Sequence, residues 1–189
     1  MAKMFSEYTS QFFWDFKRMD NVEYNFAVIE HLYAARKSSS DPSRLNKPIV
    51  ILFVAIIECA LYDFLCRIRG RTSDPLPNLA RPIIDYLNGA NHTDELNIML
   101  PRIRSQNLLR VKTGDTLYSD LEHLRLCRNR IHIQNKFNTL ARDEDSVFTD
   151  QALQTAENCF ERVIETLCNA YPRWNKQPLP MNDFPRPWL

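Results

Sequence analysis

Residues 124–133 read Leu124-Arg125-Leu126-Cys127-Arg128-Asn129-Arg130-Ile131-His132-Ile133, and they place basic side chains within an apolar helical pattern. At about 100° per residue, the residues Leu117, Leu121, Leu124 and Ile131 fall within about 80° of arc, which predicts one buried helix face. Arg128 lies inside that arc, and Arg125 and His132 border it. Because a guanidinium is costly to remove from water, Arg128 requires either a buried acid or a phosphate-like ligand.

The composition favours a helical protein with one core. The chain has 189 residues, which suits a single domain, and its 44% hydrophobic and 25% charged residues are typical of globular proteins. Only three glycines stand against eleven prolines. This balance argues against Gly-rich phosphate loops and against chains of β-hairpins, so we expect an all-α fold.

Apolar residues at spacings of three and four predict helices along most of the chain. The expected helices cover 4–36 (as one helix or as two broken near Asp20-Asn21), 48–69, 82–87, about 93–109 with a kink or division at Pro101, 116–135 and 150–170. Two stripes are especially regular: Val22, Phe26, Ile29 and Tyr33 in the first helix, and Ala152, Ala156, Phe160, Val163, Leu167 and Ala170 in the last, which Thr149 is expected to cap. Helices 48–69, 116–135 and 150–170 should pack as the core bundle.

One domain is therefore expected over 1–171, in which 1–36 forms an N-terminal helical extension and 46–171 the core bundle. The tail 172–189 is rich in proline and aromatic residues and cannot be helical. The five cysteines include no Cys-x-x-Cys pair. We interpret them as buried thiols in a reducing cytoplasm and expect neither a metal site nor a cofactor. The apolar segment 48–65 is interrupted by Glu58 and Asp63, so we expect a core helix and no membrane span.

Positive charge is concentrated in one part of the chain. Between Arg102 and Arg142 there are nine Lys or Arg residues against three acids, a local charge of +6 within a chain whose net charge is +1. Such a concentration favours a polyanionic partner, although a solvated face is a common cause of the same pattern.

Glu58 is the expected partner of the arginines. It lies in a nearly uncharged helical segment, where an unpaired carboxylate would be costly. We expect Glu58 to meet an arginine of the 116–135 helix and to hold its guanidinium toward a cleft. A purely scaffolding ion pair is the alternative, and a contact between the two residues would not separate these interpretations.

His132 is the only histidine expected to share a helix face with arginines. Histidine can move a proton near neutral pH, and arginine can neutralise a phosphate. Together they suit RNA cleavage, in which a base deprotonates the 2′-hydroxyl, an acid protonates the leaving 5′-oxygen and a cation stabilises the phosphorane. One histidine cannot easily do both proton transfers, but two copies across a dimer could.

The motif helix resembles those of the HEPN domains (higher eukaryotes and prokaryotes nucleotide-binding), in which an Arg is followed after four to six residues by His, often with a polar residue directly after the Arg. Arg125 and His132 leave six intervening residues, whereas Arg128 and His132 leave three but include the following Asn129. Both arginines are therefore candidates for the family's motif position. The resemblance is specific over the motif and only topological over the rest of 46–170.

This resemblance implies an antiparallel helical bundle and a metal-independent endoribonuclease of a toxin–antitoxin or phage-defence system, with RNA in a cleft between two copies. The implied catalytic residues are Arg125, Arg128, Asn129 and His132, supported by Glu58; the basic residues expected to contact RNA are Arg110, Lys112, Arg130 and Lys136. A homodimer is expected, with a cognate antitoxin or defence protein as a further partner. Two alternatives stay open: a catalytically inactive module that binds nucleotide, RNA or protein, and a structural helical protein.

Overall fold

The computed structural model describes residues 16–68, 79, 81–88, 95–131 and 143–172, and all of its regular structure is helical. This confirms the all-α expectation for the described part of the chain. The helices are α2 (Phe16–Ser38), α3 (Asn46–Ile68), α4 (Arg81–Asn88), α5 (Leu96–Ser105), α6 (Leu117–Arg128), α7 (Glu144–Val147) and α8 (Asp150–Ala170), with short 3₁₀ turns η1 (Pro42–Leu45) and η2 (Asn129–Ile131).

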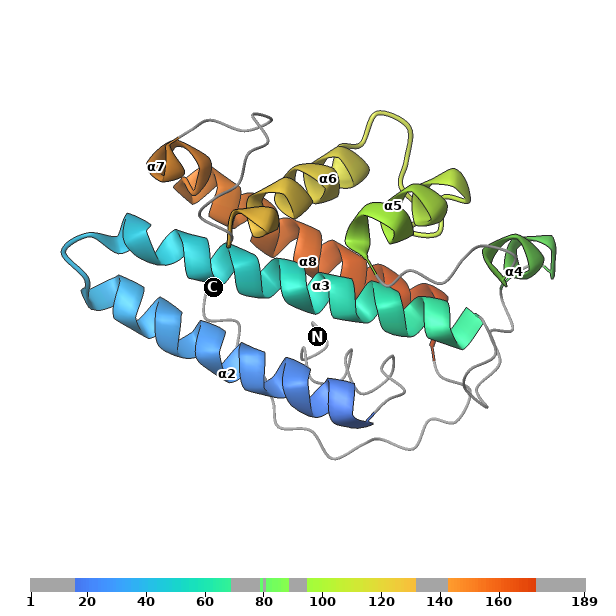
Figure 1. Cartoon of the computed structure of the whole chain (residues 1–189), viewed down its shortest axis with the longest axis horizontal. Helices are drawn as coiled ribbons and strands as arrows, with labels where there is room; N and C mark the ends of the chain where they lie inside the picture. The colour runs from blue at the N-terminus through green and yellow to red at the C-terminus, as the bar shows by residue number, and fades with distance from the viewer. Residues whose placement is uncertain (1–15, 69–78, 80, 89–94, 132–142, 173–189) are drawn as a thin grey trace.

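Helix α3 lies at the centre of the bundle. It runs antiparallel to α2 on one side and packs against α8 and α6 on the other, while α4 and α5 contact it near its C-terminal half (Figure 1). Its central position explains its composition, because a helix that is apolar on nearly all faces must be surrounded by other elements. The expected packing of the second, motif and last helices is thus confirmed.

The two regular stripes are buried as predicted. Val22, Phe26, Ile29 and Tyr33 of α2 and the six predicted positions of α8 all belong to the buried core. At its centre the ring of Phe160 lies 5.2 Å from those of both Phe26 and Phe53, so that α2, α3 and α8 meet there. The side chain of Thr149 caps α8 by accepting the backbone N–H of Ala152.

Several element boundaries differ from the expectation. α2 is unbroken at Asp20-Asn21, and α5 continues through Pro101 and ends only at Ser105. The motif helix was expected to reach 135, but α6 ends at Arg128 and tightens into η2. The expected residues 4–15 and the proline-rich tail from 173 onward lie outside the described residues.

Polar residues at the ends of α3 join it to the neighbouring helices. Asn46 is fully buried; its side-chain amide donates to the carbonyl of Phe148 (3.0 Å) and to the carboxylate of Asp150 (2.9 Å). At the other end, the buried guanidinium of Arg67 donates to the backbone carbonyls of Tyr171 (2.8 Å) and Pro172 (3.1 Å). These carbonyls follow the last turn of α8, where backbone acceptors have no helical donor.

The segment Pro42–Ile68 is long and apolar enough to cross a membrane by length and composition, with a mean hydropathy of 2.4 in its most apolar stretch. However, 67% of that stretch is buried inside the protein. A core helix passes the same test, which agrees with the central place of α3.

Candidate functional site

The predicted site lies where α6 ends. The buried face of α6 consists of Leu117, Leu121, Leu124 and Cys127. Ile131, expected to continue this face, is instead 56% exposed. The reason is local: beyond Arg128 the chain forms a 3₁₀ turn, whose residues advance by about 120° each, so a face calculated for a continuous α-helix no longer applies.

Glu58 and Arg128 form the central ion pair of this region. Oε2 of Glu58, on α3, lies 2.8 Å from Nη2 of Arg128, and Oε1 accepts the backbone N–H of Leu96 at 3.2 Å. That N–H belongs to the first turn of α5, where a carboxylate is also favoured by the helix dipole. The expectation that Glu58 pairs with an arginine of the motif helix agrees with this geometry.

The pair is less buried than the sequence suggested. The Glu58 side chain is 16% exposed but that of Arg128 is 40% exposed. Arg128 was placed in the middle of a buried seam by its helical angle. In the structure it occupies the last turn of α6, where the seam opens to solvent, and part of its guanidinium remains accessible.

The two neighbouring arginines are also paired with acids. Arg125 binds Glu122 through two nitrogens, at 3.1 and 2.5 Å. Arg130 lies 3.2 Å from the carboxylate of Glu144, which in turn lies 2.5 Å from the ammonium of Lys47. Burial raises the pKa of Glu144, but the hydrogen bonds from Lys47 and Arg130 outweigh it and hold that pKa below its usual value.

Asn129 caps the C-terminal end of α6, and its backbone N–H points to the carbonyls of Arg125 and Cys127. Asn129 is partly exposed and directly follows Arg128 in the chain. His132 and Lys136, the other two residues expected here, lie outside the described residues. The juxtaposition of His132 with the arginines therefore stays a prediction.

Arg110 and Lys112, which were also expected to contact RNA, do not lie near Arg128. They lie in the loop before α6, and Asp115, which borders the same surface, precedes the helix by two residues. The 12 residues of α6 correspond to about 18 Å at 1.5 Å per residue. The structure thus separates these two basic residues from Arg128 by roughly the length of α6.

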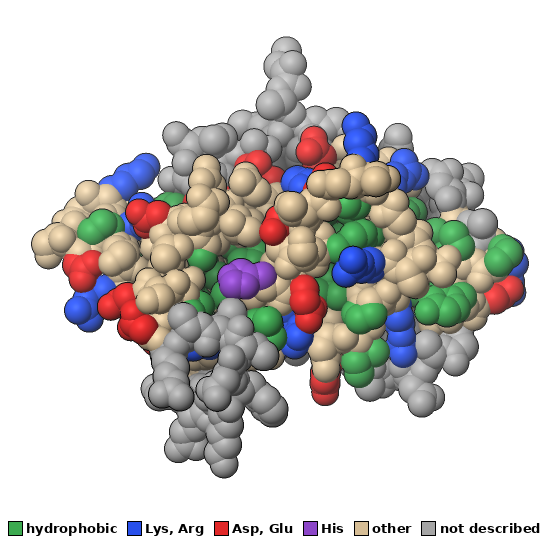
Figure 2. All heavy atoms as spheres, turned by 90° about the horizontal axis from the view of Figure 1, so that it is seen from above, with side chains coloured by type: hydrophobic (Ala, Val, Ile, Leu, Met, Phe, Trp, Pro, Cys, Tyr) green, Lys and Arg blue, Asp and Glu red, His purple; other side chains and the backbone are tan. Residues whose placement is uncertain are grey.

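Charges of both signs alternate on this side of the molecule. Figure 2 shows the side that is uppermost in Figure 1, where α5, α6 and α7 lie, and its basic and acidic side chains are interspersed. The positive charge of residues 102–142 is partly neutralised in the folded protein. Glu58 and Glu144 lie outside this segment but form ion pairs with Arg128 and Arg130 within it.

Glu144 is a site residue that sequence reasoning missed. It follows Asp143, whose side chain caps the single turn α7, and this local capping pattern was the only available signal. Nothing in it indicates which arginine the carboxylate will meet. Asp63, which interrupts the apolar run of α3, is fully buried and paired with Arg18 at 3.0 Å, a partner that the sequence does not indicate.

The cysteines offer no nucleophile beside the motif. Cys127 is buried, and burial raises the pKa of its thiol to about 11, so little reactive thiolate forms near neutral pH. Four of the five thiols are buried and Cys59 is partly exposed. Among the described residues, no three His, Cys, Asp or Glu side chains are grouped closely enough to hold a metal ion.

Comparison of the chain with family models, with curated proteins and with solved structures finds no match.

Proposed function

We propose that the chain is a metal-independent endoribonuclease of the HEPN type, which cleaves RNA in a cleft between two copies and serves a toxin–antitoxin or phage-defence system. The observation that carries the proposal is the ion pair of Glu58 and Arg128. A carboxylate from the central helix holds this guanidinium at 2.8 Å while leaving 40% of the arginine side chain exposed. This arrangement fits a cation presented to a ligand better than one that only fills a core.

Arg128 keeps donors for a phosphate. A guanidinium carries five N–H donors, and Glu58 engages one of its terminal nitrogens. The remaining donors can bind two oxygens of a phosphate, as arginine commonly does. In the proposed reaction Arg128 stabilises the negative charge that grows on the phosphorane, and Asn129 adds a neutral donor beside it.

His132 supplies the proton transfers. The neutral imidazole of one copy takes the proton of the 2′-hydroxyl, whose oxygen attacks the adjacent phosphorus. The imidazolium of the second copy gives a proton to the 5′-oxygen as the P–O bond breaks, leaving a 2′,3′-cyclic phosphate. Because each copy contributes one histidine, the dimer is part of the mechanism. The exposed Ile131 offers an apolar contact next to the motif for such an interface.

A second candidate is a catalytically inactive module that uses the same surface to bind RNA, a nucleotide or a partner protein. The pairing of Arg125 with Glu122 and of Arg130 with Glu144 favours a partner protein as the ligand of such a module, because both acids compete with a phosphate for these cations. On this proposal Arg128 is a binding residue and His132 has no essential role.

Incubation of the purified protein with total RNA in EDTA tests the first candidate. Cleavage should persist without metal, disappear in His132→Ala and fall strongly in Arg128→Ala. Arg104→Ala is the matched control, because Arg104 is an exposed arginine on α5, and it should cleave normally. RNA binding without cleavage would favour the inactive module. Absence of both would exclude the ribonuclease and leave only a nucleotide or a partner protein as the ligand of the inactive module.

A further inference from the structure

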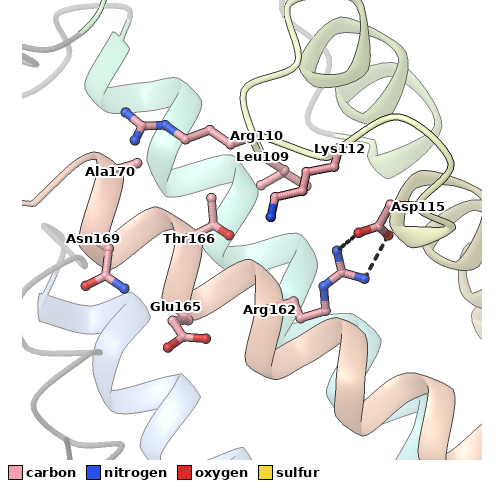
Figure 3. Close-up of a pocket in the computed structure, with 9 residues that line it drawn as sticks. All are labelled: Leu109, Arg110, Lys112, Asp115, Arg162, Glu165, Thr166, Asn169 and Ala170. Carbon is pink, nitrogen blue, oxygen red and sulfur yellow. Dashed lines mark hydrogen bonds and ion pairs between the residues drawn. The ribbon is translucent and has the colours of Figure 1, made fainter.

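A pocket of about 540 Å³ lies between the loop that precedes α6 and the C-terminal half of α8. Arg110, Lys112, Arg162, Thr166 and Asn169 contribute polar side chains to its lining (Figure 3). The pocket adjoins the start of α6, whereas Arg128 ends that helix. It is therefore a separate site, and the argument for it does not rest on the proposed ribonuclease.

The loop is held in a costly backbone conformation. Arg110 has a φ of 52° and Asn107 a φ of 45°, which L-residues rarely adopt. The side chain of Asn107 stabilises the loop, since it accepts the backbone N–H of Val111 (2.9 Å) and donates to its carbonyl (3.0 Å). Such strain persists where the surroundings fix it, and it is common at binding sites. Here it places Arg110 and Lys112 at the mouth of the pocket.

The pocket is lined by three basic residues and two acidic ones, and only one of the basic residues forms an ion pair with an acid of the lining. Arg162 binds Asp115 through both terminal nitrogens, at 2.9 and 2.5 Å, and these hydrogen bonds hold the pKa of Asp115 below its usual value. That pair is neutral overall. Glu165 is the other acid of the lining. Its carboxylate points away from the side chain of Lys112 (Figure 3).

Lys112 is the cation best placed for a ligand. It projects from the loop toward α8, into the space between Thr166 and Arg162 (Figure 3). Within the described part of the chain, no hydrogen bond or ion pair occupies its ammonium group. The guanidinium of Arg110 lies 5.6 Å from the ring centre of Tyr171 and also hydrogen-bonds that side chain, so some of its five N–H groups remain available to a ligand.

We propose that this pocket binds the phosphate group of a small ligand, with Lys112 and Arg110 as its charged donors and the Thr166 hydroxyl as a neutral one. A phosphate offers several acceptor oxygens and up to two negative charges, which matches donors arriving from two sides of the pocket. Asn169 and Glu165 can bind hydroxyl groups of the rest of the ligand. The carboxylate of Glu165 disfavours an extended polyanion across the same surface, so a small molecule fits better than an RNA chain.

Titration of the full chain with inorganic phosphate and with ribose 5-phosphate, followed by two-dimensional amide NMR, tests the proposal. Both probes should shift the amide signals of Val111, Lys112 and Thr166 in a saturable way, and ribose 5-phosphate should bind more tightly. Lys112→Ala should weaken binding of both at least tenfold, and Thr166→Val several-fold. Lys112 is exposed, so its replacement should leave the fold intact.

Lys37→Ala is the matched control, since it removes the same charge from an exposed position at the end of α2. It should bind both probes as the wild type does. Equal weakening by Lys37→Ala and Lys112→Ala would reduce the effect to general electrostatics and overturn the proposal, as would shifts that never saturate. A short RNA that binds this pocket more tightly than ribose 5-phosphate would overturn the assignment of a small ligand.

Discussion

The carboxylate of Glu58 joins the ends of two helices: it lies 2.8 Å from Arg128 at the end of α6 and accepts the backbone N–H of Leu96 at the start of α5. One side chain of the central helix thereby fixes both the guanidinium and the neighbouring helix. Its removal should affect stability and activity through different contacts, which makes the two effects separable.

Glu58→Ala should lower the free energy of unfolding by about 1–2 kcal/mol, because it removes a partly exposed ion pair and one backbone acceptor. A fully buried pair would cost about 3–5 kcal/mol, which the 40% exposure of Arg128 argues against. Urea denaturation measures the change. In a double-mutant cycle with Arg128→Ala, the coupling should stay below about 1 kcal/mol; a coupling several times larger would contradict the open geometry.

Glu58→Gln should reduce RNA cleavage by about 10–100-fold while largely preserving the fold, because a misplaced guanidinium stabilises the transition state poorly. Gln can still accept the Leu96 N–H but does not hold Arg128 by charge. We expect the loss mainly in kcat, since Glu58 acts through Arg128 and not on RNA. A change confined to KM would instead indicate a role in RNA binding alone.

The proposed mechanism requires two copies, so the protein should sediment as a dimer at micromolar concentration, and specific activity should fall on dilution below the dissociation constant. Ile131→Asp should weaken the dimer, because it would place a charge at an exposed apolar contact. Cleavage by a strict monomer would refute the use of two histidines.

Glu122→Gln should strengthen RNA binding by up to about fivefold, because it frees Arg125 from a pair worth less than about 1 kcal/mol. Filter binding at several salt concentrations measures both the affinity and the number of released counterions. Glu161→Gln, on α8, is the control for the loss of one negative charge. If both variants gain equally, the effect is one of net charge and Arg125 is not specifically involved.

Glu157 should make the protein less stable as the pH rises. Burial raises the pKa of this carboxyl, although the hydrogen bond from Tyr33 opposes the rise. A carboxyl whose folded-state pKa is raised binds its proton more tightly in the folded state, so its contribution to stability declines as the pH rises from its usual value through the raised one. Glu157→Gln should remove this decline in urea denaturation between about pH 4 and pH 8.

Asp150 provides a control of opposite sign. Hydrogen bonds from Asn46 and Arg36 hold its pKa below the usual 3.8. Its contribution is therefore present above that value and is lost as the pH falls through the lowered pKa. Asp150→Asn should flatten the acid end of the stability curve and lower stability by a constant amount across the neutral range, where the slope of the curve should not change. If both variants changed stability over the same pH range, the decline in stability with rising pH could not be assigned to Glu157.

The periodicity of apolar residues predicts which side chains form the core, but it does not predict where the motif helix ends. The stripe of α8 could be predicted because burial on one face selects apolar residues at helical spacing, and Glu58 could be predicted because a lone acid among apolar residues needs a partner. The end of α6 at Arg128 could not, since no Gly or Pro follows before residue 135. The pairing of Arg130 with Glu144 could not be predicted either. The two residues lie in different short elements, η2 and α7, and no sequence pattern around Arg130 indicates which acid it will contact.

The hydrogen bonds of Arg67 to Tyr171 and Pro172 also affect how the chain can fold during its synthesis. The acceptors follow Arg67 by 104 and 105 residues. At the usual rates of translation the ribosome needs about 5–20 s to make them. Until then the apolar helix α3 has no α8 to cover it, and the guanidinium of Arg67 must remain in water. A nascent chain in this interval exposes the kind of surface that chaperones bind.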